Sequence, residues 1–250
     1  FCLNYLYISA IGIDHDSLFE KDQDILVLPL DLIKFDTHEK LTQDVLKHFG
    51  KVDILVNNAG RTQRGLVEKT SLEVDRALLD LNVVGTISLT KAVLPHMIER
   101  HEGQIVVVSS VAGKIETPFM ATYCASKHAL QGYFDTARLE LTEHNIHVQT
   151  VLPGPVESNI DLSAFTENIN DVNDEFKDPP GAPDFVQIMS TERCAELMAV
   201  SVANNLDEVW ISSEPALVMV YFKQYLPNLF RWLSKMFFLE GVKRLYTDKN

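Results

Sequence analysis

The chain has 250 residues, which is enough for one large hydrophobic core or two small ones. Apolar residues make up 46% and charged residues 23%, a balance that is typical of a globular protein and excludes a disordered chain. The formal net charge is −13, so we expect no nucleic-acid partner, because such a partner attracts basic surfaces. The three cysteines (Cys2, Cys124 and Cys194) are too few for a disulfide framework.

Short runs rich in Val, Ile and Leu predict five β-strands. These runs show little alternation between apolar and polar residues, as is typical of strands that are covered on both faces in a parallel sheet. We expect strands at residues 24–30, 53–57, 104–109, 147–152 and 208–212.

Amphipathic stretches between these runs predict helices. The first ends before Gly50, a residue suited to a helix C-cap, and the second contains Gly85 and Pro95, which are expected to bend or divide it. Because strands and helices alternate, the sequence predicts an α/β fold with a Rossmann-like, doubly wound parallel sheet. We expect helices at residues 37–49, 71–100, 123–143 and 191–203.

Two regions depart from this alternation. Residues 155–190 are rich in proline and acids and lie between a strand and a helix, so they form either a cover over a ligand or a solvated surface loop. Residues 215–250 combine aromatic side chains with an excess of Lys and Arg. This composition fits a membrane-surface contact, a homodimer contact, or burial against the core of the same domain. We therefore divide the chain into a main domain at 1–214 and an amphipathic helical extension at 215–250.

The strongest chemical signal is Tyr123 followed four residues later by Lys127, at an expected helix start. Residues at this spacing lie on the same side of a helix, about 5–6 Å apart at Cβ. A nearby ammonium, together with a cationic cofactor ring, is expected to lower the pKa of the phenol toward neutrality, which creates a proton donor or acceptor for catalysis.

Small and polar residues close several expected strands, where a parallel sheet binds its ligands. A serine there can hydrogen-bond a substrate carbonyl as negative charge develops on it. Asn82 is a further candidate, because asparagine is unfavourable inside the long helix expected there. The strand-end residues are Asp31, Leu32, Asn57, Ala59, Ser110, Val156 and Ser158.

Taken in order, these motifs resemble the short-chain dehydrogenase/reductase family over about residues 22–213. The resemblance rests on NNAG at 57–60, Ser110, YCASK at 123–127 and PGPVES at 153–158. It implies an enzyme that transfers a hydride between a nicotinamide cofactor, NADP(H) rather than NAD(H), and a lipophilic carbonyl or alcohol of steroid, retinoid or aldehyde type. It also implies association with the endoplasmic reticulum membrane, the alternative being the cytoplasm.

The same resemblance implies a role for each candidate residue. Tyr123 would be the general acid/base, Lys127 would lower its pKa and bind the nicotinamide ribose, and Ser110 would polarise the substrate carbonyl. Asn82 would hold a water molecule that links Lys127 to solvent. The cofactor contacts would be Asp31 and Leu32 near adenine, Asn57 and Ala59 on the adenosine side, and Val156 and Ser158 at the nicotinamide amide.

One departure from the family pattern concerns the glycines. No two of the 11 glycines form a G-x-G or G-x-x-G pair, so the glycine-rich turn that holds a pyrophosphate in this family is absent. The run at 24–30 would correspond to the third strand of the family, so the first strand and helix are expected to be missing. Either residues 1–12 fill that place or the missing piece belongs to a longer native chain. The alternative function is a catalytically inactive protein that uses the scaffold without a cofactor.

Overall fold

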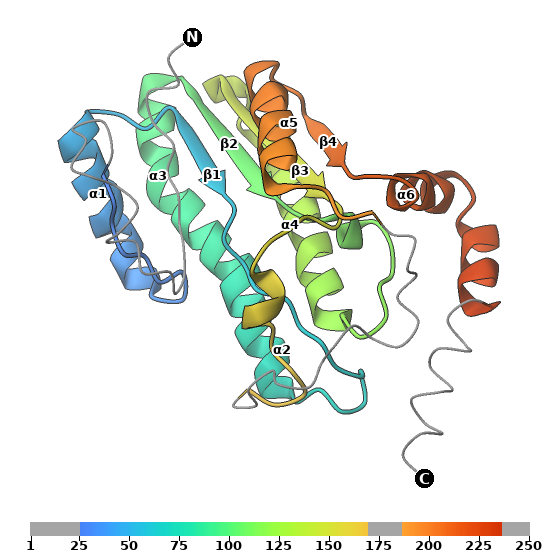
Figure 1. Cartoon of the computed structure of the whole chain (residues 1–250). Helices are drawn as coiled ribbons and strands as arrows, with labels where there is room; N and C mark the ends of the chain where they lie inside the picture. Colours follow the sequence, from blue (N-terminus) through green and yellow to red (C-terminus); the bar gives the residue numbers. More distant parts are fainter. Residues whose placement is uncertain (1–25, 170–186, 237–250) are drawn as a thin grey trace.

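The computed structural model describes residues 26–169 and 187–236 of the chain (Figure 1). Its centre is a sheet of four parallel strands in the order β1-β2-β3-β4. The strands are β1 (Ile54–Asn57), β2 (Gly103–Val108), β3 (Ile146–Pro153) and β4 (Glu208–Ile211). The expected strands at 53–57, 104–109, 147–152 and 208–212 are therefore confirmed.

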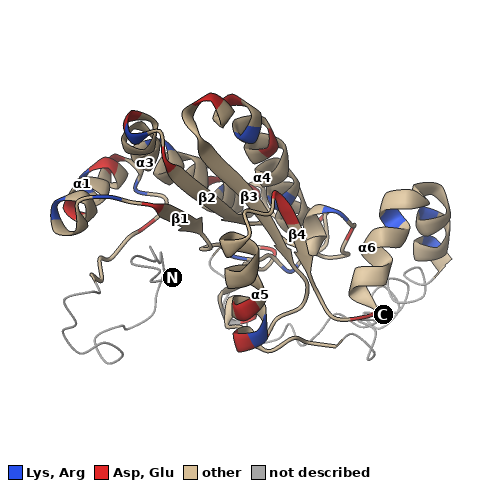
Figure 2. Cartoon of the chain, turned by 90° about the horizontal axis from the view of Figure 1, so that it is seen from above, with Lys and Arg blue, Asp and Glu red and all other residues tan. Residues whose placement is uncertain are grey.

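Helices cover both faces of this sheet (Figure 2). Alternate residues of β2 face opposite ways: Ile105 and Val107 pack in one core cluster, and Val106 packs in another. The first cluster lies under α1 (His38–Phe49), α3 (Thr86–Arg100) and α4 (Ala121–Glu140), and the second lies under α5 (Thr191–Ala203). This arrangement confirms the Rossmann-like α/β fold.

The expected helix at 71–100 is three helical segments in sequence. α2 (Leu72–Leu79) is followed by a π-helical turn at Asp80–Gly85 and then by α3. The expected change at Gly85 is confirmed, but a division at Pro95 is wrong, because α3 continues through it. Within the described ranges, only Leu72–Arg100 is long and apolar enough to cross a membrane by length and composition. Much of its apolar surface lies against the sheet, as in a core helix.

The segment before α1 does not form the strand expected at 24–30. Residues 26–30 adopt no regular secondary structure, and residues 24 and 25 lie outside the described part. Leu30 and Leu32 are nevertheless buried in the core, which explains the apolar run. A strand needs a neighbour for its hydrogen bonds, and no described strand lies beyond β1 to supply one.

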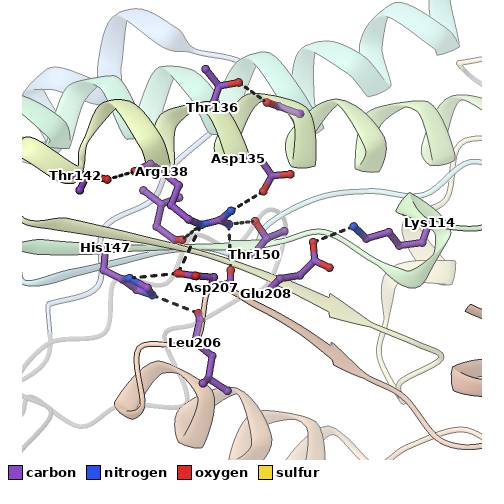
Figure 3. A network of polar contacts seen from close by, with 12 residues as sticks. Lys114, Asp135, Thr136, Arg138, Thr142, His147, Thr150, Leu206, Asp207 and Glu208 are labelled. Carbon is purple, nitrogen blue, oxygen red and sulfur yellow. Dashed lines mark hydrogen bonds and ion pairs between the residues drawn. The ribbon is translucent and has the colours of Figure 1, made fainter. Parts of the chain in front are cut away.

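α4 is fixed to the sheet by Arg138, near the end of the helix opposite Tyr123 (Figure 3). Its guanidinium donates to the carbonyl oxygens of Val148 at 2.7 Å and Asp207 at 3.1 Å, and to the Thr150 hydroxyl at 3.2 Å. Because an α-helix is stiff, the contacts of Arg138 also help to position the first turn of α4. That turn lies about 22 Å from Arg138 along the helix, at 1.5 Å per residue.

The described part of the C-terminal extension consists of α6 (Ala216–Tyr225) and a second helix at 227–236. Val220 and Phe230 are buried in a cluster with Val111 and Ile115, so one side of the extension packs on the domain. Other side chains remain exposed. They include Tyr221, Tyr225, Leu229, Trp232 and Met236, with exposed fractions between 45% and 75%.

The insert at 155–190 is described at its two ends. Residues 155–169 contain a 3-10 helix at Ile160–Ser163, and Val156 forms a β-bridge with Met189. Phe165 forms a second bridge with Gln63, so this end of the insert lies against the loop that follows β1. The remainder of the insert, residues 170–186, lies outside the described part.

Candidate active site

The carboxyl ends of the parallel strands bring the sequence candidates to one edge of the sheet. Asn57 is the last residue of β1, and Ser110 follows β2 by two residues. The first turns of α4 carry Tyr123 and Lys127 to this edge. The sequence therefore predicts correctly that residues from separate elements meet there.

Tyr123 lies in a small apolar cluster and is only 8% exposed. Burial raises the pKa of its phenol to about 12, although the neighbouring Ser110 hydroxyl and the charge of Arg64 act to lower the pKa. The expected lowering of this pKa by Lys127 together with a cationic cofactor ring stays a prediction, because Lys127 is not among the groups that shift it in the chain by itself. The loss of hydration of the phenolate outweighs the favourable contacts.

Lys127 is almost completely buried, with 4% exposed. Its Nζ donates to the carbonyl oxygen of Val108 at 2.9 Å and lies 5.6 Å from the centre of the Tyr123 ring. Burial lowers the pKa of the ammonium to about 8. The spacing of four residues thus places the two groups side by side, but the hydrogen bond of the ammonium goes to the backbone of β2.

Ser110 lies at the start of a short 3-10 helix, Val111–Gly113. Its hydroxyl accepts a hydrogen bond from the Ala112 N–H at 3.1 Å and donates to the Pro153 carbonyl at 3.3 Å. The second bond is long and therefore weak, so the hydroxyl proton can be redirected to another oxygen at little cost.

Asn82 lies in the π-helical turn and is 1% exposed. Its side-chain amide donates to the Ser126 hydroxyl at 3.0 Å, and that hydroxyl donates to the Tyr123 carbonyl at 2.8 Å. The same amide holds both backbone groups of Arg61. π-Helical turns often occur at functional sites, and this one explains an asparagine in a long helical stretch.

Gly60 brings the backbone after β1 close to this group. A Cβ atom at Gly60 would lie 3.0 Å from Oδ1 of Asn82 and 3.7 Å from Nζ of Lys127. Asn57 is buried and donates to the Thr90 hydroxyl at 3.0 Å, while Ala59 packs against the main core. Gly60 has no side chain, so a ligand can approach the backbone beside the buried ammonium of Lys127. This arrangement at the edge of the sheet fits the nicotinamide and ribose half of a dinucleotide.

The adenine-side and amide-side candidates have partners of their own within the protein. The carboxylate of Asp31 accepts from the Ile33 N–H at 3.2 Å and lies 3.6 Å from Nζ of Lys34, so it caps a turn. Leu32 is buried, whereas Ser158 is exposed, and Val156 packs partly against the core under α5. These contacts leave their proposed roles toward a cofactor as predictions.

The structure brings three further residues to the site that are not among the sequence candidates. Ser126 joins Asn82 to the backbone of Tyr123, and it stands inside the YCASK motif, where its position was a usable signal. Arg61 directly follows NNAG and contacts Asn82. Phe165 packs in the same apolar cluster as Tyr123, and no local sequence signal points to that long-range contact.

Comparison with known proteins shows the family of this chain. The model of the short chain dehydrogenase family matches residues 15–168. Dehydrogenase/reductase SDR family member 7 of Mus musculus is 47% identical over 236 residues, and that of Homo sapiens is 46% identical over 231 residues. Each match covers 92% of this chain, and the chain spans 66% of the length of these relatives.

Solved structures show the same fold. A short-chain dehydrogenase from Streptomyces avermitilis matches with a TM-score of 0.68 and 28% identity, covering 87% of this chain and 79% of its own. A carveol dehydrogenase from Mycobacterium avium, solved in complex with NAD, matches with a TM-score of 0.52 and 30% identity over 54% of this chain and 50% of its own. The chain therefore belongs to the short-chain dehydrogenase/reductase family of oxidoreductases, whose members typically depend on NAD(P).

Proposed function

We propose that this protein transfers a hydride between NADP(H), rather than NAD(H), and a lipophilic carbonyl or alcohol, with Tyr123 as the general acid/base. The observation that carries the proposal is the grouping of a buried phenol, a serine hydroxyl and a buried ammonium at the carboxyl edge of a parallel sheet. Apolar side chains surround the phenol, which favours an apolar substrate.

Each polar group has a distinct task in carbonyl reduction. Tyr123 is protonated at neutral pH, because its pKa is raised to about 12, and so it can donate its proton to the carbonyl oxygen. Ser110 gives that oxygen a second hydrogen bond by redirecting its weak bond from Pro153. When bound, the cofactor supplies the hydride in reduction and receives it in oxidation.

The residues near Gly60 would hold the nicotinamide and ribose half of the cofactor, with Lys127 as the hydrogen-bond donor to the ribose. Asn82 would keep a water molecule near Lys127, in addition to the bonds that it makes within the protein. The remaining proposed cofactor contacts are Asp31, Leu32, Asn57, Ala59, Val156 and Ser158.

The test is reduction of an apolar ketone with NADPH or NADH by the purified protein and by Tyr123→Phe. Loss of a general acid is expected to lower kcat by roughly 10²- to 10⁴-fold. Tyr133→Phe is a matched control, because Tyr133 lies on the same helix and is 36% exposed. Turnover of Tyr123→Phe within two-fold of the parent would contradict the assignment.

A second candidate function, a catalytically inactive protein without a cofactor, is favoured by the absence of any G-x-G or G-x-x-G pair from the sequence. NADPH fluorescence separates the two candidates directly. Enhanced fluorescence that saturates at micromolar protein supports the enzyme, and the absence of any change supports the inactive scaffold.

We also propose that the C-terminal helices contact a membrane surface. Their exposed aromatic and aliphatic side chains lie beside two exposed cations, Arg231 and Lys235, a combination suited to anionic lipid headgroups. Lys223 is not available for this role, because it pairs with Glu116. A homodimer formed through the same surface is the competing outcome of a binding experiment.

A further inference from the structure

Arg61 connects the cofactor side of the site to its opposite wall. Its backbone N–H donates to Oδ1 of Asn82, and its carbonyl accepts from Nδ2 of Asn82, both at 2.9 Å. Its side chain extends in another direction, where Nε donates to the Ser163 carbonyl at 2.6 Å. The centre of its guanidinium lies 3.7 Å from the centre of the Phe165 ring.

The segment 160–167 lies against the loop that contains Arg61. The Phe165 N–H donates to the Thr62 carbonyl at 2.9 Å, and the Phe165 carbonyl accepts from the Arg64 N–H at 2.8 Å. Arg64 also forms an ion pair with Asp161 at 2.7 Å. The backbone hydrogen bonds fix the path of this segment. The side chains of Arg61 and Arg64 contact Ser163, Phe165 and Asp161 along it.

Phe165 is 8% exposed and belongs to the apolar cluster that contains Tyr123 and Met120. It therefore forms part of the wall beside the proposed proton donor. The guanidinium of Arg61 lies over this ring, and burial lowers the pKa of Arg61. A lysine ammonium cannot make this contact and replace the Nε bond to Ser163 at the same time.

We propose that Arg61 is a specificity-determining, positioning residue that holds Phe165 beside Tyr123 and thereby sets how closely a ring-bearing carbonyl substrate fits the site. The inference rests on the function proposed above and goes beyond it in naming what shapes the apolar wall. A fused-ring substrate buries more apolar surface against this wall than a single-ring substrate does. Loosening Phe165 therefore impairs the larger substrate selectively.

The test compares cyclohexanone with 2-decalone, a fused two-ring ketone, in the parent and in Arg61→Met, Arg61→Lys and Phe165→Leu. We expect kcat/KM for 2-decalone to fall roughly ten-fold more than kcat/KM for cyclohexanone in all three variants, mainly through KM, because lost apolar contacts remove binding energy. Phe165→Leu keeps an apolar side chain but removes the ring under the guanidinium. If Arg61→Met folds poorly, Phe165→Leu tests the loss of the same contact between Arg61 and Phe165.

Arg193→Met is the matched control, because Arg193 lies on α5 and pairs only with the exposed Glu196 among the contacts described for it. In Arg193→Met, the ratio of kcat/KM for 2-decalone to kcat/KM for cyclohexanone should equal that of the parent. Equal losses for both ketones in the Arg61 variants would show that Arg61 only stabilises the fold, and would overturn the proposal.

Amide hydrogen exchange gives a readout that does not depend on turnover. Exchange of the N–H groups of Arg64 and Phe165 should be faster in Arg61→Met than in the parent, and unchanged in Arg193→Met. Unchanged exchange in Arg61→Met would show that Arg61 does not hold Phe165 in place, and would overturn the proposal. If the parent reduces neither ketone, the proposed function fails and the specificity role fails with it, while the exchange result still reports separately whether Arg61 holds the segment.

Discussion

Nζ of Lys127 donates its hydrogen bond to the carbonyl oxygen of Val108 at 2.9 Å, and not to the hydroxyl of Tyr123. The ammonium lies 5.6 Å from the centre of the Tyr123 ring. A buried ammonium with one backbone acceptor loses much of its hydration, so its protonated form is disfavoured. Burial and backbone contacts thus fix the positions of Tyr123 and Lys127, and the charge of each side chain depends on pH.

The stability of the protein is expected to depend on the titration of Lys127. The folded pKa of about 8 lies below the ordinary lysine pKa of 10.5, so the unfolded chain binds more protons between these limits. Stability from this group therefore rises with pH across that window, by about 2 kcal/mol between pH 8 and 10 at about 1.4 kcal/mol per pKa unit. Urea unfolding of Lys127→Met at pH 8, 9 and 10 should lack this rise.

The control for that experiment is Lys47→Met, an exposed lysine of α1, which should follow the parent. Parallel curves for the parent and Lys127→Met would contradict the shift. The window stops at pH 10 because Tyr123 acts in the opposite direction above it. Its folded pKa of about 12 lies above the ordinary tyrosine pKa of 10, so stability from the phenol falls as pH rises further.

Gly113 and Gly132 should respond in opposite ways to alanine. A Cβ at Gly113 would lie 2.0 Å from Nε2 of Gln131 and 3.0 Å from the Lys127 carbonyl, whereas nothing lies within 4 Å of one at Gly132. Gly113→Ala is therefore expected to destabilise the protein by about 1–3 kcal/mol. Gly132→Ala, at an exposed position of α4, should stabilise it by about 0.5–1 kcal/mol.

Urea unfolding of both glycine variants measures these changes. Gln131 also donates to the Gly113 carbonyl at 2.8 Å, so the clash in Gly113→Ala removes a buried hydrogen bond as well. A Gly113→Ala variant as stable as the parent would show that the loop after Ser110 packs less tightly on α4 than the structure indicates.

Removal of the Arg138 anchor should loosen α4 from the sheet. Arg138→Met loses hydrogen bonds to β3 and to the Asp207 carbonyl, and we expect a loss of about 2 kcal/mol in the free energy of unfolding. Arg193→Met removes an exposed pair and should change stability by less than about 0.5 kcal/mol. Chemical denaturation of the two variants checks the difference, and equal small effects would contradict the anchoring role.

Binding of the C-terminal helices to lipid can be measured by sedimentation with vesicles of phosphatidylcholine and phosphatidylserine. The double variant Tyr225→Ser, Trp232→Ser removes two exposed aromatic rings and should weaken binding roughly ten-fold. Leu139→Ser is the control, because Leu139 is 78% exposed on α4. High salt should weaken binding of the parent, since Arg231 and Lys235 contribute charge.

Two outcomes would contradict the membrane proposal. The first is equal vesicle binding by the parent and the double variant. The second is a concentration-dependent dimer of the parent in analytical ultracentrifugation that the double variant loses, without any binding of the parent to vesicles. That result would assign the same surface to self-association.

The sequence by itself determined the features that depend on local spacing. Four strands followed from apolar runs, the end of α1 followed from Gly50, which has φ of +81°, and the pairing of Tyr123 with Lys127 followed from the helical repeat. The family followed from motifs in a fixed order. The strand runs, the helix end and the Tyr123–Lys127 pair depend on residues a few positions apart, and the family depends on the order of motifs along the chain, so these features could be recognised without coordinates.

Only the tertiary structure decided what long-range contacts control. The run at 24–30 is apolar enough for a strand, but residues 26–30 have no described neighbour for their backbone hydrogen bonds. The pKa of Tyr123 depends on how deeply the phenol is buried, and the wall at Phe165 depends on Arg61, about 100 residues earlier in the chain. Burial and pairing are properties of the packed chain, and spacing along the sequence does not determine them.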